Sequence, residues 1–225
     1  MNSTLFDRLR GGLIVSCQAP EGSPLRDPYI LARIAKAAED AGAVAIRAEG
    51  LANVEAIQKE VSLPVIGLIK RATNSPIYIT PDISDVTDLA HAGADIIAVD
   101  ATDRLREGGV SATEFLTQAV EIVGPLPIMA DIDSVSSAQI AERAGASIIG
   151  TTLSGYTGGP IPKQPDIQLV ADIAKNVTAP IIAEGRYHSA EEVQQALQHG
   201  AMAVCIGTTL TDPWTLTKRL VAQLK

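Results

Sequence analysis

Residues 92–100 read AGADIIAVD, and this stretch decides the fold because its plan recurs three more times along the chain. In each copy an Ala-Gly-Ala or His-Gly-Ala step is followed by a run of apolar residues, at positions 41–47, 144–150 and 199–206. A helix commonly ends at a glycine, and a short run rich in valine and isoleucine is typical of a buried strand. Each copy therefore predicts the end of a helix followed by a strand.

Four further apolar runs complete the set of predicted strands. Three of them begin with proline, at 64–66, 127–129 and 180–182, and one lies near the start of the chain at 12–17. Their apolar residues are continuous, which is typical of parallel strands that are covered on both faces. Eight such strands, separated by stretches with helical spacing, predict an α/β protein with a closed (β/α)8 barrel in one domain, residues 1–225.

The competing architecture is an open, doubly wound sheet. Such a sheet has about five or six strands and a Gly-rich dinucleotide-binding turn after the first of them. Residues 16–20 read SCQAP and contain no such turn, so the repeat favours the closed barrel.

The composition excludes several classes of function. A net charge of −8, a pI near 4.9 and 3% aromatic residues argue against a nucleic-acid-binding surface. No run of 18 apolar residues occurs, so no membrane span is expected, and the N-terminus lacks the pattern of a secretory signal. Cys17 and Cys205 lie in apolar runs without metal-type spacing, which predicts reduced core cysteines in a cytoplasmic protein and no metal site.

Polar residues gather where the predicted strands end. In a barrel of this kind the chemistry lies at these ends, because the loops that follow the strands surround one mouth. Lys70 follows the apolar strand that starts at Pro64, and Glu184 follows the strand that starts at Pro180. A lysine at the tip of a buried strand loses solvation, which lowers its pKa towards neutrality, so Lys70 can exchange protons with a carbon acid. The other polar tips are Gln18, Arg47, Asp100, Asp131, Thr151 and Thr152.

The position of each candidate along its strand predicts where its side chain points. Counted from the opening proline, Asp131 and Glu184 are four residues along and Lys70 is six residues along. The shared parity predicts that all three side chains point into the barrel. The third and seventh strands of an eight-stranded barrel lie opposite each other, so Lys70 and Glu184 are expected on opposite walls of one pocket. The alternative for Glu184 is a structural ion pair with Arg47 or Arg186.

These tips and their flanking residues resemble the N-acetylmannosamine-6-phosphate 2-epimerase family, and the resemblance runs from Gly12 to Arg219. The resemblance implies a TIM barrel of the ribulose-phosphate-binding type that forms a homodimer. Eight motifs in the same order carry it: GLIVSCQA (12–19), IRA (46–48), PVIGLIKR (64–71), ITP (79–81), VDAT (99–102), MADI (129–132), TTLSGYT (151–157) and IAEGR (182–186).

The resemblance implies the interconversion of N-acetylmannosamine 6-phosphate and N-acetylglucosamine 6-phosphate in sialic acid breakdown, with no redox cofactor or metal. The sugar ring opens so that the C1 aldehyde acidifies the C2 proton, a base removes that proton, and a proton returns to the other face. Lys70 matches the family's central acid–base lysine, and Glu184 matches its assisting glutamate. The sequence leaves open whether one group serves both faces or two groups serve one face each.

Four residues at the mouth are expected to contact the sugar or to hold the groups that do. Gln18 and Arg47 are expected to hydrogen-bond the sugar. Asp131 is expected to orient Lys70 or to bind a hydroxyl, the alternative being an ion pair with Arg47 that closes the mouth. Thr152 is expected to line the pocket.

The phosphate group is expected on the loops after the last two strands, where glycines let backbone N–H groups approach an anion. Relatives often carry a basic residue shortly after the last strand, but this chain has Asp212 there, so either Arg186 neutralises more of the anion or Asp212 points away. Tyr156 lies in the Gly-rich stretch 154–160, which is long enough to act as a lid, the alternative being an ordinary flexible connection. The expected phosphate-binding residues are Gly185, Arg186, Gly207 and Thr208.

Two other classes of function remain open at this point. Another phosphosugar isomerase, decarboxylase or aldolase would share the phosphate loops, and an aldolase would use Lys70 to form a Schiff base. A non-catalytic phosphosugar sensor would keep the pocket, and loss of Lys70 or Glu184 would favour it, but both are present. The final segment, 213–224, predicts an amphipathic helix that either closes the barrel or packs on a partner subunit.

Overall fold

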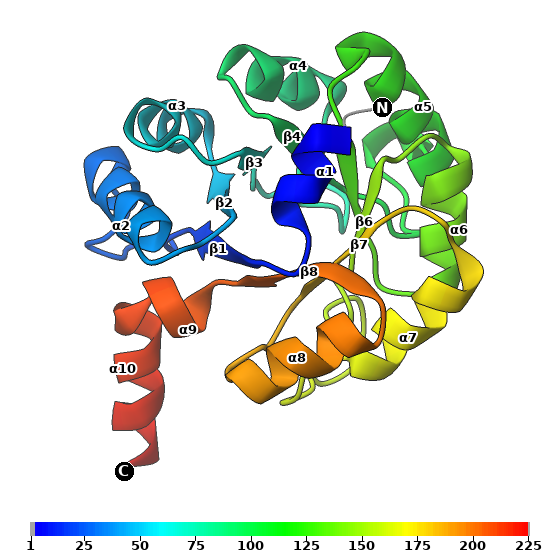
Figure 1. Cartoon of the computed structure of the whole chain (residues 1–225). Coiled ribbons are helices and arrows are strands. Elements are labelled where there is room, and N and C mark those ends of the chain that lie inside the picture. The colour runs from blue at the N-terminus through cyan, green and yellow to red at the C-terminus, as the bar shows by residue number, and fades with distance from the viewer. Residues whose placement is uncertain (1–2, 225) are drawn as a thin grey trace.

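In the computed structural model, which describes residues 3–224, parallel strands close into a barrel in the order β1 to β8 (Figure 1). Each strand pairs with the next one along the chain, and β8 pairs with β1. The predicted closed (β/α)8 barrel is therefore confirmed, with a strand at each expected apolar run. The strands are β1 (Leu13–Cys17), β2 (Ala45–Glu49), β3 (Val65–Leu68), β4 (Ile96–Asp100), β5 (Ile128–Asp131), β6 (Ile148–Gly150), β7 (Ile181–Glu184) and β8 (Ala201–Ile206).

Helices connect successive strands and cover the outside of the barrel (Figure 1). These helices are α2 (Pro28–Asp40), α3 (Leu51–Glu60), α4 (Ile83–His91), α5 (Ala112–Val123), α6 (Val135–Arg143), α7 (Ile167–Asn176) and α8 (Ala190–Gln198). A short 3-10 turn, Glu107–Gly109, precedes α5. Before β1, helix α1 (Ser3–Leu9) lies across one end of the barrel, where Leu9 is fully buried among the interior side chains.

The repeated Gly-Ala step ends helices as the sequence predicts. Helices α2, α4, α6 and α8 each run into a glycine with positive φ, at Gly42 (96°), Gly93 (90°), Gly145 (95°) and Gly200 (106°). Glycine adopts this conformation without the steric penalty of a Cβ atom, so the chain reverses there and enters the next strand. Side chains at the opposite ends accept hydrogen bonds from backbone N–H groups of the first turn, as at Asp27, Ser111, Ser134, Asp166 and Ser189.

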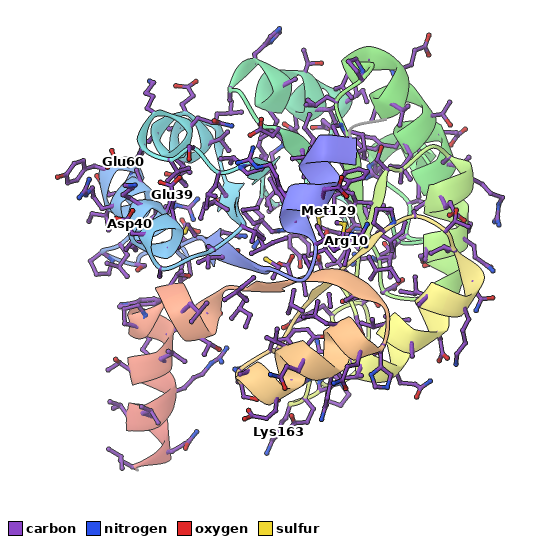
Figure 2. All side chains as sticks on the ribbon, viewed as in Figure 1. Arg10, Glu39, Asp40, Glu60, Met129 and Lys163 are labelled. Atoms are coloured by element: carbon purple, nitrogen blue, oxygen red, sulfur yellow. The ribbon has the colours of Figure 1, made fainter. Side chains whose placement is uncertain are left out.

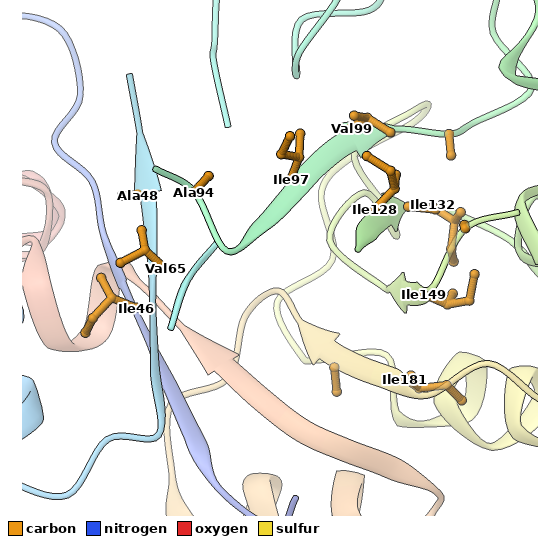
Figure 3. Packing of buried hydrophobic residues seen from close by; sticks show 14 of the residues in the cluster. Ile46, Ala48, Val65, Ala94, Ile97, Val99, Ile128, Ile132, Ile149 and Ile181 are labelled. Atoms are coloured by element: carbon orange, nitrogen blue, oxygen red, sulfur yellow. The ribbon is translucent and has the colours of Figure 1, made fainter. Parts of the chain in front are cut away.

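Alternation along each strand divides the core into two layers. Outward-facing residues pack between the strands and the surrounding helices, among them Ile46, Val65, Ile97, Ile128 and Ile149 (Figure 3). Inward-facing residues fill the barrel, namely Ile14, Ala45, Ile66, Leu68, Ile96, Ala98, Met129, Ile148, Ile182, Ala203 and Cys205. Because the alternation has a period of two, it places the polar residues at the strand ends on the interior side.

The last helix, α10 (Pro213–Gln223), leaves the barrel wall. It follows the short helix α9 (Thr208–Thr211) and extends away from the barrel (Figure 1), and none of its residues is buried. Leu220, Val221 and Leu224 expose 64%, 48% and 85% of their surface. The strands close the barrel without this helix, so the first of its two expected positions is not observed. Within residues 3–224, no helix has the length and apolar character needed to cross a membrane.

Candidate active site

A pocket of about 960 Å³ opens at the carboxyl ends of the strands. Asp131 is fully buried and does not line this pocket, which does not support the expectation that it binds a sugar hydroxyl. Asp100 and Thr151 do not line it either, whereas ten other candidate residues from the sequence do: Gln18, Arg47, Lys70, Thr152, Tyr156, Glu184, Gly185, Arg186, Gly207 and Thr208. The barrel therefore brings the candidates from both halves of the chain to one place.

Lys70 lies two residues beyond the end of β3. Ile66 and Leu68 point into the barrel, and the same parity carries the Lys70 side chain into the pocket above them. Its Nζ donates a hydrogen bond to Oε1 of Gln18 at 2.6 Å, and Nε2 of Gln18 donates to Oγ of Ser16 at 2.8 Å. These bonds hold the amine at the wall formed by β1.

The pKa of Lys70 is lowered from its ordinary value of 10.5. The main cause is the surrounding protein, which removes water from the ammonium group, and the second is the positive charge of Arg47. The carboxylates of Glu184, Glu49 and Asp131 act in the opposite direction. The side chain still reaches solvent through the open mouth, so its desolvation is partial. A lysine with a lowered pKa carries more neutral amine near pH 7 and can serve as a base.

At the floor of the pocket, Arg47 joins two carboxylates. Its Nη1 lies 3.2 Å from Oδ1 of Asp131 and 3.1 Å from Oε2 of Glu184, and its Nη2 pairs with Oδ2 of Asp131. The guanidinium is almost fully buried and rests on Met129 near the centre of the barrel (Figure 2), with Nη1 3.5 Å from the Met129 sulfur. Both structural ion pairs considered from the sequence, Arg47–Asp131 and Arg47–Glu184, are therefore present.

Glu184, at the end of β7, is held in place by its neighbours. The Thr151 hydroxyl donates to the Glu184 carbonyl and accepts from the Glu184 N–H, both at 3.0 Å. The pKa of the Glu184 carboxyl is raised from 4.5, mainly because burial disfavours its charge, with Arg47 acting against this and Asp131 adding to it. A carboxyl with a raised pKa retains its proton closer to neutral pH and can serve as a general acid.

Two residues of the β6 end complete this buried layer. The Thr152 hydroxyl lies 2.6 Å from Oδ1 of Asp131 and 3.3 Å from Oε2 of Glu184, so its one proton can serve either carboxylate. Gly150 faces the same layer, and a Cβ atom there would lie 2.8 Å from Oδ1 of Asp131. A glycine at this position is needed for the close approach of Asp131, a requirement that the sequence analysis missed.

Lys70 and Glu184 face the same pocket from β3 and β7, the strands on opposite sides of the barrel. Within the described residues they form no ion pair with each other, although each influences the pKa of the other. An amine with a lowered pKa and a carboxyl with a raised pKa thus lie at opposite walls of the pocket. This arrangement suits proton transfer to and from both faces of one carbon atom.

Arg186, in the loop after β7, holds the loop after β6 in place through side-chain hydrogen bonds. Arg186, which has a positive φ of 64°, donates from Nε to the Gln164 carbonyl at 2.7 Å and from Nη1 to the Ser154 carbonyl at 2.6 Å. Its guanidinium also lies over the Tyr156 ring, 5.3 Å from the ring centre. The cation expected to neutralise a phosphate therefore also holds the predicted lid segment, residues 154–160, against the pocket.

Asp212, in the loop after β8, lines the pocket, so the expectation that it points away is not met. Asp212 caps α10 by accepting a hydrogen bond from the Thr215 N–H at 2.9 Å, and it is mostly buried. The Thr211 hydroxyl donates to the Ser16 carbonyl at 2.7 Å and fastens α9 to β1. As in the first turn of any helix, the N–H groups of Thr208 and Thr209 have no intrahelical acceptor and are available to an anion.

Residues that the sequence analysis did not single out also line the pocket. Tyr78, in the loop after β3, is half exposed there, and burial raises the pKa of its phenol. Asp100 lies outside the pocket and instead accepts hydrogen bonds from Thr102 and Arg104 in the turn that follows β4. Among residues 3–224 no group of His, Cys, Asp and Glu side chains is suited to hold a metal ion.

Comparisons with known proteins agree on one family. A family model described as "Putative N-acetylmannosamine-6-phosphate epimerase" matches residues 31–225. A protein of Caldanaerobacter subterraneus named "Putative N-acetylmannosamine-6-phosphate 2-epimerase" is 48% identical over 227 residues, which cover 100% of this chain and 96% of that protein. A protein of the same name from Klebsiella pneumoniae is 48% identical over 205 residues, which cover 91% of this chain and 86% of that protein.

Solved structures give the same result. The N-acetylmannosamine-6-phosphate 2-epimerase from Clostridium perfringens superposes with a TM-score of 0.92 at 37% identity, covering 99% of this chain and 97% of that one. Thiamine phosphate pyrophosphorylase from Pyrococcus furiosus reaches a TM-score of 0.58 at 16% identity, covering 91% and 88%, and shares the fold alone. The matched length, the identities and the superposition lead to one conclusion: the chain belongs to the N-acetylmannosamine-6-phosphate epimerase family.

Proposed function

We propose that this chain interconverts N-acetylmannosamine 6-phosphate and N-acetylglucosamine 6-phosphate by moving a proton at C2. Family membership supports this assignment. The observation that carries the chemistry is the opposed placement of Lys70 and Glu184 in one pocket, with their pKa values shifted towards each other. Such a pair can take a proton from one face of a carbon acid and return one to the other face.

The reaction begins with the open-chain sugar, whose C1 aldehyde acidifies the C2–H bond. Neutral Lys70 removes the C2 proton, and the electrons of that bond move into an enolate that extends to O1. Protonated Glu184 then donates its proton to C2 from the opposite face, which inverts the configuration. The reverse reaction uses the same two groups with their protons exchanged, because Glu184 is then the base and Lys70 the acid. No redox cofactor or metal enters these steps.

Neighbouring residues hold the Lys70 amine and the Glu184 carboxyl in position. Gln18 holds the Lys70 amine through a 2.6 Å hydrogen bond, and Arg47 holds the Glu184 carboxyl through a 3.1 Å ion pair. Asp131 acts through Arg47, which it holds from below, and Thr152 supports both carboxylates. Gln18, Arg47 and Thr152 also line the pocket, so their remaining hydrogen-bonding capacity is available to the sugar oxygens.

The phosphate binds at the loops after β7 and β8 in this proposal. Gly185 and Gly207 let the backbone approach the anion closely, the first turn of α9 at Thr208 offers N–H groups, and Arg186 supplies positive charge. Asp212 also lines the pocket, but its carboxylate accepts a hydrogen bond from the Thr215 N–H at the N-terminus of α10, which offsets part of its negative charge. Tyr156 and the lid segment cover the substrate from the side of β6, where Arg186 holds them.

The protein acts as a cytoplasmic homodimer in this proposal, with α10 at the subunit interface. Leu220 and Val221 on α10 and Leu224 directly after it expose apolar surface that a second copy can cover. Arg219 of the same helix lines the pocket, so contact at α10 would also affect the site. Cys17 and Cys205 are free and buried, which suits the reducing conditions of the cytoplasm.

The decisive experiment follows the protein with N-acetylmannosamine 6-phosphate in D2O by proton NMR. We expect N-acetylglucosamine 6-phosphate that carries deuterium at C2, because the donating group exchanges its proton with solvent. Lys70→Ala and Glu184→Gln are each expected to lower kcat by about 10²- to 10⁴-fold, the usual contribution of a general acid or base. The control Lys175→Ala removes an exposed lysine of α7 and should leave kcat unchanged.

The alternative classes of function give different results in the same assay. An aldolase that uses Lys70 as a Schiff base would be inactivated by borohydride in the presence of substrate, with the added mass on the peptide that contains Lys70. A sensor would bind the phosphosugar without turnover. Folded wild-type protein that binds N-acetylmannosamine 6-phosphate but neither converts it nor exchanges its C2 proton would contradict the proposed activity.

A further inference from the structure

The chain does not run directly from β3 into α4 but folds back beside Lys70. Pairing between β3 and β4 reaches Gly67–Ile97. Beyond it, Lys70 forms an antiparallel bridge with Ile79, and the Arg71 N–H donates to the Tyr78 carbonyl at 3.1 Å. Residues 78–80 therefore take the position next to β3 at the mouth of the barrel.

The same segment is bonded to β4 on its other side. The Asp100 N–H donates to the Ile79 carbonyl at 3.2 Å, and the Ile79 side chain is buried with the interior residues of the barrel. Residues 78–80 thus form a wedge that separates the ends of β3 and β4. This wedge, defined by Tyr78, Ile79 and Thr80, includes part of the ITP motif that the proposed reaction does not use.

Thr80 makes the contacts that fix the wedge. Its N–H donates to the Ile69 carbonyl at 2.7 Å, and its hydroxyl oxygen accepts from the Ile69 N–H at 3.3 Å. The hydroxyl proton is donated to the Ala98 carbonyl of β4 at 2.6 Å. Thr80 therefore hydrogen-bonds both the carbonyl and the N–H of Ile69, the residue directly before Lys70. Its hydroxyl also anchors this segment to β4. We call these contacts the Thr80 grip.

The backbone of Thr80 is strained while it makes these contacts. Its φ is 44°, and among residues 3–224 the other non-glycine residue with positive φ is Arg186, at the candidate phosphate loop. Positive φ is unfavourable for a β-branched residue, and such strain persists where the surrounding structure holds it, often at functional sites. Thr80 is also completely buried, so it cannot contact substrate itself.

We propose that Thr80 is a positioning residue for Lys70. Its grip on Ile69 sets the direction in which the chain leaves β3 and thereby holds the Lys70 amine against Gln18, facing Glu184 across the pocket. This inference rests on the proposed function for its catalytic consequence, but the placement of Lys70 is independent of the substrate. The candidate phosphate loops lie after β7 and β8, so loss of the grip should affect the chemical step more than substrate binding.

Three substitutions separate positioning from general stability. Thr80→Gly removes the hydroxyl, and glycine accepts the positive φ without strain, so this variant should fold. Thr80→Val removes the hydroxyl but keeps the shape, and Thr80→Ser keeps the hydroxyl. The matched control is Thr102→Val, because the Thr102 hydroxyl is equally buried on the neighbouring loop but bonds to Asp100 and Arg104.

We expect Thr80→Gly and Thr80→Val to lower kcat by about 10- to 100-fold, the order of loss produced by small misplacement of a reacting group, while KM changes less than about twofold. Thr80→Ser should retain kcat within about threefold, and Thr102→Val should resemble the wild type. The comparison is made at a temperature where circular dichroism shows every variant folded. A wild-type kcat for Thr80→Gly, or equal losses for Thr80→Gly and Thr102→Val, would overturn the inference.

A second readout needs no turnover. Acetic anhydride modifies the neutral amine of lysine, so the rate of acetylation of the Lys70 peptide, followed by mass spectrometry against pH, reports the pKa of Lys70. The charged groups around this amine are Arg47 and Glu49 of β2, Asp131 of β5 and Glu184 of β7, and none of them is changed in the variants.

Loss of the two hydrogen bonds of the Thr80 hydroxyl should bring the Lys70 amine further into solvent and move its titration to higher pH in Thr80→Gly but not in Thr80→Ser or Thr102→Val. An unchanged titration in Thr80→Gly would overturn the inference. If the wild type shows no epimerase turnover, the proposed function fails, and this titration still decides the role of Thr80.

Discussion

Nη1 of Arg47 lies 3.1 Å from Oε2 of Glu184, while Nη2 of the same guanidinium pairs with Asp131. These residues come from β2, β7 and β5, so one buried cation holds carboxylates from two other parts of the barrel. A buried charge without a partner is costly, and Arg47 therefore stabilises the charged forms of both carboxylates, whereas Asp131 disfavours the charged form of Glu184. Glu184 therefore belongs both to the structural ion pair with Arg47 and to the proposed acid–base pair with Lys70.

Replacement of Arg47 should destabilise the fold. Arg47→Met leaves Asp131 and Glu184 buried without their cation, and we expect a loss of about 3–5 kcal/mol in the free energy of unfolding, measured by urea denaturation. The control Arg33→Met removes an exposed ion pair with Glu60 and should cost less than about 1 kcal/mol. Equal losses in the two variants would contradict the view that burial makes the Arg47 group important.

The rate should depend on pH through the Lys70–Glu184 pair. The active form carries one proton on the pair in either direction, because one group must give a proton while the other takes one. Activity is therefore lost at low pH, when a second proton binds, and at high pH, when the last proton leaves. Since the pKa of Glu184 is raised above 4.5 and that of Lys70 is lowered below 10.5, both limbs of kcat should fall inside this interval.

The measurement is kcat against pH in both directions of the reaction, where kcat reports the enzyme–substrate complex. The two directions should show limbs at similar positions, because their active forms carry the same number of protons. A plateau that extends down to pH 4.5 or up to pH 10.5 would contradict the assignment of these two groups.

A negative charge at Gln18 should weaken Lys70 as a base. Gln18 accepts a hydrogen bond from Nζ of Lys70 at 2.6 Å, so the carboxylate of Gln18→Glu would stabilise the ammonium form and raise the pKa of Lys70. We expect kcat at pH 7 to fall about tenfold or more and to recover as the pH rises. The neutral control Gln18→Met should not show recovery at high pH.

Loss of Arg186 should loosen the lid segment and weaken phosphate binding. Arg186→Gln removes the charge, the two hydrogen bonds to the carbonyls of Gln164 and Ser154, and the contact with the Tyr156 ring. KM should rise about tenfold or more, the effect of losing a charge-assisted hydrogen bond, and proteases should cut faster within residues 154–164. Unchanged KM and proteolysis would show that Arg186 has neither role.

The exposed apolar residues of α10 should control assembly. Leu220→Asp places a charge on a side chain that is 64% exposed in one chain and that we expect to be covered in the homodimer. Sedimentation should then show a shift towards monomer, while Gln223→Asp, which adds the same charge at the end of the same helix, should leave the assembly unchanged. Equal sedimentation of Leu220→Asp and wild type would argue against an interface at α10.

Local patterns were sufficient to predict the barrel and its mouth. The four Gly-Ala steps end helices because glycine tolerates positive φ, and the apolar runs form strands because parallel strands are covered on both faces. The two-residue period then placed Lys70 on the interior side of β3, where the structure has it. These features depend on neighbouring residues and on the strand order, so no distant contact was needed to infer them.

Other features depend on contacts between distant segments. Gly150 is required because the Asp131 side chain approaches it from the neighbouring strand β5, and this contact has no local signal in the chain. For Asp131 the sequence left two roles open, orienting Lys70 or binding a hydroxyl on the one hand and an ion pair with Arg47 on the other, and the structure shows the ion pair beneath the pocket. The partner of a buried side chain depends on how the strands pack in three dimensions, and the spacing of residues along the sequence does not specify that packing.

The sequence by itself determined the closed barrel, the polar mouth and the opposition of Lys70 and Glu184, because helix ends, strand periodicity and strand order follow from local chemistry and chain order. Only the tertiary structure decided how those two residues are held. Gln18 and the wedge at Thr80 support Lys70, while Arg47 and Thr151 support Glu184, from segments far apart in the chain. The physical reason is that pKa values and side-chain positions depend on burial and neighbouring charges, which exist only once the strands have closed around them.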